Sequence, residues 1–72
     1  MSETVYTVAI IHCDTEQIES ICGVRTKLDG NYNSANGLAD LMSTRLNDDY
    51  YAAVLIGKDW KKGDTVPEAD KV

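Results

Sequence analysis

The stretch TVYTVAIIHCDTEQIESICGVRTKL, residues 4–28, decides the fold, because it contains two strand-like segments joined by a short polar connection. Residues 4–13 are rich in β-branched side chains and apolar at both alternating sets of positions, which is typical of a central strand. Residues 18–28 alternate more clearly between apolar and polar side chains. The polar residues 14–17 suit a tight connection, so the stretch predicts an antiparallel hairpin.

The apolar spacing changes after the hairpin, and residues 35–46 are predicted to form an amphipathic helix. One stripe at a period of 3.6 residues contains Ala35, Leu38, Ala39, Met42 and Leu46. Residues 31–34 supply capping side chains before it. Because glycine costs about 1 kcal/mol inside a helix, Asn36 and Gly37 leave a later start at Gly37 or Leu38 open. Residues 50–57, YYAAVLIG, are predicted to form a third strand.

This β-β-α-β order predicts an α+β fold in two layers. A right-handed crossover through the helix makes the third strand parallel to the second. The third strand then pairs antiparallel with the first, giving a three-stranded antiparallel sheet in the order 2-1-3 with one helix on one face. A chain of 72 residues is long enough for one domain. We expect residues 1–60 to form that domain and the polar residues 61–72 to form a flexible C-terminal tail.

A hairpin with a four-residue connection predicts which side chains share a face of the sheet. It places Tyr6 opposite Arg25, and Ile10 opposite Ile21. In this register the helix covers the face that contains Val5, Ala9, Ile11, Cys22 and Val24. The other face then carries Tyr6, Val8, Ile10 and Ile21, and an apolar surface of this kind predicts self-association. The alternative is that Trp60 and the C-terminal tail fold back over this face.

The charge of the chain argues against several classes of function. Twelve acidic and seven basic residues give a formal net charge of −5, which disfavours binding to a phosphate backbone. One basic and aromatic group could contact a single nucleic-acid strand, namely Trp60 with Lys58, Lys61 and Lys62. Because of the net charge, we nevertheless expect no direct nucleic-acid contact. No apolar run approaches the length of a membrane span, and no signal peptide is indicated. We therefore expect a cytoplasmic protein that binds no membrane.

The only histidine and both cysteines lie within residues 12–22, next to Asp14. His12 and Cys13 are neighbours on a strand, so their side chains point to opposite faces, which disfavours both a shared metal and a Cys-His nucleophile. Cys13 and Cys22 are separated by about 13 Å along the hairpin, beyond the reach of a disulfide. We expect free thiols, a surface contact between His12 and Glu19, and no catalytic residue, metal or cofactor.

These observations predict a small non-enzymatic protein that binds and modulates another, basic protein. The candidate partner-binding residues are acidic and lie in two places, Asp14, Glu16 and Glu19 around the hairpin and Asp48 and Asp49 before the third strand. If the two groups lie at opposite ends of the domain, only one of them can be the main partner-binding group. In its sharper form the hypothesis is a self-associating inhibitor of a nucleic-acid-binding enzyme, by analogy with small acidic accessory proteins of bacteriophages. The alternative is a small metal- or thiol-dependent enzyme that uses His12, Cys13 and Asp14.

Overall fold

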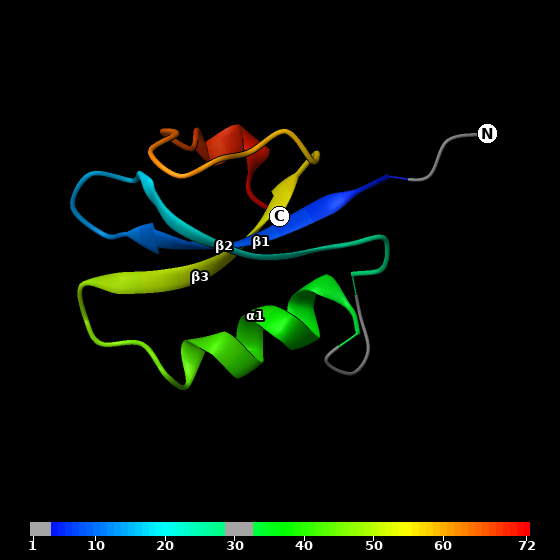
Figure 1. Ribbon diagram of the computed structural model, residues 1–72, viewed down its shortest axis with the longest axis horizontal. Helices are drawn as coiled ribbons and strands as arrows, with labels where there is room; N and C mark the ends of the chain where they lie inside the picture. The colour runs from blue at the N-terminus through cyan, green and yellow to red at the C-terminus, as the bar shows by residue number, and fades with distance from the viewer. Residues whose placement is uncertain (1–3, 29–32) are drawn as a thin grey trace.

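The computed structural model describes residues 4–28 and 33–72. Within these ranges the chain forms β1 (Tyr6–His12), β2 (Ile18–Arg25), α1 (Ala35–Ser43), β3 (Tyr50–Ile56) and the short 3-10 helix η1 (Glu68–Asp70). The strands make one sheet in the order β2-β1-β3, in which β1 pairs antiparallel with both neighbours. Helix α1 packs on one face of it (Figure 1). The predicted α+β fold and its strand order are confirmed.

Helix α1 begins earlier and ends earlier than its apolar period suggests. The Ser34 hydroxyl accepts a 3.0 Å hydrogen bond from the Gly37 backbone N–H, so the helix begins at Ala35 rather than at Gly37 or Leu38. This cap satisfies a free donor of the first turn and offsets the cost of the glycine. Residues 31 and 32, where further capping side chains were expected, lie outside the described residues. The helix ends at Ser43, so Leu46 belongs to the connection that follows.

The β1–β2 register differs from the prediction in half of the hairpin. Tyr6 pairs with Arg25 as predicted, but Ala9 pairs with Ile21 and Ile11 pairs with Ile18. Two irregularities, after Val8 and after Ile10, shift the pairing by one residue each. Each bulge adds an unpaired residue to one strand and changes the side-chain alternation beyond it.

The predicted assignment of the β1 side chains to the two faces is wrong, whereas Cys22 packs under the helix as predicted. Val8 is fully buried in the cluster under α1, together with Leu38 and Val54, and Tyr6 packs against this cluster. Ala9 and Ile11, which were expected under the helix, belong to a second cluster on the opposite face. The set Tyr6, Val8, Ile10 and Ile21 therefore forms no bare apolar face, and Ile21 shares a face with Ala9 instead. Self-association through an open face formed by these four side chains therefore has no basis in the structure.

The C-terminal segment, residues 57–72, covers the sheet face opposite α1 (Figure 1). Gly57 has a φ of 105°, a left-handed conformation that favours glycine. Val66, only 3% exposed, packs against Ile11 and Leu55 in the second cluster. The segment is also bonded to the hairpin, since the Val66 N–H donates to the Glu16 carbonyl over 3.0 Å.

The alternative that Trp60 and the segment fold over the face away from the helix thus describes the structure, although β1 contributes Ala9 and Ile11 to that face rather than Tyr6 and Val8. Trp60 packs against the second cluster, and its indole N–H donates to the Ile56 carbonyl over 2.9 Å. The domain boundary at residue 60, with a flexible tail beyond it, stays a prediction. The burial of Val66 argues against it.

Candidate functional site

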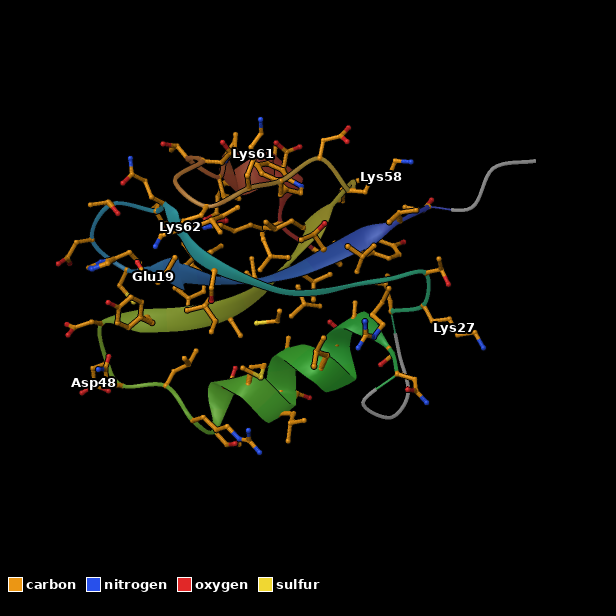
Figure 2. All side chains as sticks on the ribbon, viewed as in Figure 1. Glu19, Lys27, Asp48, Lys58, Lys61 and Lys62 are labelled. Atoms are coloured by element: carbon orange, nitrogen blue, oxygen red, sulfur yellow. The ribbon has the colours of Figure 1, made fainter. Side chains whose placement is uncertain are left out.

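The hairpin connection and the α1–β3 connection lie against each other at one end of the domain (Figure 2). The Cys13 N–H donates a 2.9 Å hydrogen bond to the Asp49 carbonyl. The Cys13 thiol lies 3.5 Å from the Asp48 carbonyl, to which it donates. These two contacts join segments that are 35 residues apart in the chain. The predicted acidic groups therefore occupy one end and do not compete from opposite ends.

We call this surface the acidic end and define it by the exposed residues Asp14, Glu19, Asp48 and Asp49. Figure 2 shows Glu19 and Asp48 at this end of the molecule. The α1–β3 connection also carries the exposed base Arg45, and Lys62 precedes Gly63, whose N–H bonds to Ile18 next to Glu19. The four acidic residues thus share this end with two basic residues. The net charge of this surface is negative, and its carboxylates project from two connections rather than from a cavity.

Glu16 was predicted to belong to the same surface, but its side chain is engaged elsewhere. The Tyr51 hydroxyl donates a 2.7 Å hydrogen bond to Glu16 Oε2, and Lys71 Nζ lies 3.0 Å from Glu16 Oε1. Lys71 also pairs with Glu68 over 3.2 Å and lies 5.1 Å from the centre of the Tyr51 ring. Glu16 thus ties the hairpin to β3 and to the C-terminal segment.

The backbone of Glu16 is strained, which the same contacts explain. Its φ of 58° is left-handed, a conformation that costs a residue with a side chain about 1 kcal/mol or more. Its N–H donates to the His12 carbonyl over 2.9 Å, and its carbonyl accepts from Val66. Bonds on both sides of the peptide hold the conformation in place.

The ionisation of the three side chains is coupled through these bonds. The hydrogen bond from Tyr51, followed by that from Lys71, holds the pKa of Glu16 below its ordinary value. Burial is the first cause that raises the pKa of Tyr51. The interaction with Tyr51, followed by the two carboxylates, raises the pKa of Lys71 although burial opposes the shift. A charged Glu16–Lys71 pair bonded to a neutral tyrosine is therefore stable at neutral pH.

A groove runs along the outer edge of β3, and the sequence did not indicate it. Its volume is about 360 Å³. Helix α1 forms one wall with Ala39, Asp40 and Ser43, while Glu68, Lys71 and Val72 of the C-terminal segment form the other. The floor is the edge of β3, from Tyr51 to Val54. We call it the β3 groove. The sequence feature that could have indicated it is the pair of small residues Ala52 and Ala53 on its floor.

His12, Cys13 and Asp14 are not grouped as a metal-binding site in the part of the chain that is described. His12 lies edge-on to the Tyr50 ring, with 4.9 Å between ring centres, and not opposite Glu19, because the bulges move Glu19 away from it. Cys13 is exposed and Cys22 is half-buried, and both are free thiols. Among the residues in the described ranges, no three His, Cys, Asp or Glu side chains are grouped to hold a metal ion.

The basic residues near Trp60 lie on the C-terminal segment. Figure 2 shows Lys58, Lys61 and Lys62 on the side of the sheet away from α1. The Trp60 ring is packed against the core and its N–H is bonded to Ile56. The ring is therefore engaged within the fold rather than extended as a platform on which a base would stack.

None of the helices in the described ranges has the length and apolar character needed to cross a membrane. Compared with protein-family models, with curated proteins and with solved structures, the chain matches none of them.

Proposed function

We propose that the protein acts by binding a basic region of another protein through its acidic end, and that it modulates this partner without catalysing a reaction. The observation that carries the proposal is the pair of hydrogen bonds from Cys13 to the carbonyls of Asp48 and Asp49. They hold two acidic connections together as one surface. Negative charges gathered in this way steer a positively charged partner toward the surface during diffusion.

The residues proposed for binding are Asp14, Glu19, Asp48 and Asp49. Glu16 is left out, because Tyr51 and Lys71 already occupy both of its carboxylate oxygens. In the sharper form of the proposal the partner is a nucleic-acid-binding enzyme, whose basic cleft these carboxylates would fill. A cleft that binds a phosphate backbone presents lysine and arginine side chains at the spacing of charged oxygens.

A comparison of two charge reversals tests the proposal. Wild type, Asp48→Lys and Asp59→Lys would each be immobilised and exposed to the same cell extract, and the retained proteins identified by mass spectrometry. Asp59 is exposed but lies on the C-terminal segment, so its reversal changes the net charge equally while leaving the acidic end intact. The proposal requires a partner retained by wild type and by Asp59→Lys but lost with Asp48→Lys. Equal loss in both variants would reduce the effect to net charge.

A further inference from the structure

We infer that the β3 groove binds an extended segment of the partner, which adds to the sheet as a strand antiparallel to β3 and carries basic residues at its C-terminal end. The inference rests on the proposed function, because it describes how the same partner is held. Addition of a strand to an exposed sheet edge is a recurrent way to bind a peptide.

The edge of β3 already pairs with a strand-like segment at one end. Leu55 and Lys71 form an antiparallel bridge, and the Val72 N–H donates a 2.9 Å hydrogen bond to the Val54 carbonyl. Because strand groups repeat with a period of two, the N–H and C=O of Ala52 point outward in the same direction as those of Val54. No segment in the described ranges outside the sheet forms a backbone hydrogen bond with Ala52. The described residues therefore pair with this edge as far as Val54, and the groove lies along the part of β3 that precedes it.

The walls of the groove leave room for a peptide backbone. Ala39, Ala52 and Ala53 are small, and the open volume beside them is about 360 Å³. Side chains of a strand placed there would point alternately to the α1 wall and to the wall formed by the C-terminal segment. The first wall presents Asp40 and the second presents Glu68. Lys71, the base that lines the groove, is paired with Glu16 and Glu68.

The direction of the added strand follows from its antiparallel pairing. It runs from Val54 toward Tyr50, so its C-terminal residues arrive beside Asp49 and Asp48, which directly precede β3. Basic residues at that end would meet the acidic end, while the preceding residues pair with the backbone of β3. The groove and the acidic end thus form one continuous binding surface for a single extended segment.

A pair of synthetic peptides tests the inference. The probe is acetyl-Thr-Val-Thr-Val-Lys-Lys-amide, and the control is the same peptide with the four Thr and Val backbone nitrogens methylated. The two have identical charge, but the four methylated residues of the control, which would lie along β3, cannot donate backbone hydrogen bonds to it. Hydrogen exchange by NMR, with the probe at millimolar concentration, would follow the Ala52 amide. The Ala53 amide, which points toward β1, serves as an internal reference.

The inference predicts that the probe slows exchange at Ala52 by about tenfold once nine-tenths of the protein is bound, whereas the methylated control leaves it unchanged. The variant Ala52→Pro should fold but no longer bind the probe, because an outward N–H on an edge strand is dispensable for folding. The variant Ala53→Pro should unfold the domain, since it removes a hydrogen bond to β1. Unfolding of Ala53→Pro would verify that the Ala53 N–H points toward β1 and the Ala52 N–H points outward.

The outcomes separate the inference from the proposed function. If the probe leaves Ala52 exchange unchanged, or if the methylated control binds equally, the groove does not take a strand and the inference is overturned. Loss of a natural partner on Asp48→Lys would still support the acidic end in that case. If instead the probe protects Ala52 and Asp48→Lys retains every partner, the strand site stands and the proposed charge recognition fails.

Discussion

The hydroxyl of Tyr51 on β3 donates a 2.7 Å hydrogen bond to the carboxylate of Glu16 in the hairpin connection. This bond, with the Glu16–Lys71 ion pair, joins three segments that are distant in the chain. It keeps Glu16 away from the solvent-facing carboxylates of the acidic end, so the acidic residues of the hairpin divide into a structural one and a set free to meet a partner.

The Glu16 carboxylate predicts a pH dependence of stability. Its folded pKa lies below the ordinary 4.5, so its bonds stabilise the fold above pH 4.5 and are lost as the pH falls through the folded pKa. Glu16→Gln should therefore unfold more easily than wild type at neutral pH, and the difference should shrink toward acid. Urea unfolding between pH 3 and pH 7 measures it. A difference that is constant with pH would contradict the role of the charge.

The assignment of sheet faces predicts a contrast between Val8 and Ile21. Val8 is fully buried under α1, while Ile21 is 39% exposed on β2. Val8→Asp should unfold the domain, because an unpaired buried charge costs several kcal/mol, against a total stability of about 4–10 kcal/mol for a chain of this size. Ile21→Asp should remain folded by circular dichroism. If Val8→Asp also stayed folded, the result would favour the face assignment expected from the sequence, which placed both residues on the open face.

These two residues also show how far sequence patterns reach. The strand order followed from the apolar character of β1 and the handedness of the crossover, both of which are local or general constraints. The choice of face did not, because β1 is apolar on both sides and so carries no preference for the helix. The two bulges then changed the side-chain alternation of β2. One of them lies at Glu19, where the sequence has no glycine or proline to indicate a bulge.

The β3 groove could not be predicted from the sequence for a different reason. It depends on α1 and the C-terminal segment lying on either side of the β3 edge, a relationship set by packing on two opposite faces of the sheet. Val66 is the buried residue that joins the segment to the second cluster, with Trp60 packed beside it, and a single valine in a polar stretch resembles a tail. The acidic end was partly predictable, because its residues were identified, but their meeting depends on Cys13.

The C-terminal segment should contribute to stability through Val66. Val66→Ala is expected to lower the free energy of unfolding by about 2 kcal/mol, from lost burial and a residual cavity. Val72→Ala is the control, since Val72 is 58% exposed, and its effect should stay within about 0.5 kcal/mol. Chemical denaturation of both variants gives the comparison. Equal, small effects of the two substitutions would support the prediction of a flexible tail from residue 61 onward.

The two thiols should differ in reactivity. Cys13 is exposed, whereas burial raises the pKa of the half-buried Cys22. Because the thiolate is the reactive form, Cys13 should be alkylated by iodoacetamide first. Timed quenching followed by peptide mass spectrometry gives both rates, and Cys13→Ser identifies the slower one. Faster labelling of Cys22 would show that its environment is open.

The central claim is that the acidic end recruits a basic partner by charge. The most direct measurement is the association rate constant of an identified partner as a function of salt, for wild type, Asp48→Lys and Asp59→Lys. The account predicts that Asp48→Lys slows association about threefold or more at low ionic strength and weakens its salt dependence, while Asp59→Lys has little effect. A wild-type rate that is independent of salt, with both variants indistinguishable from it, would contradict the claim.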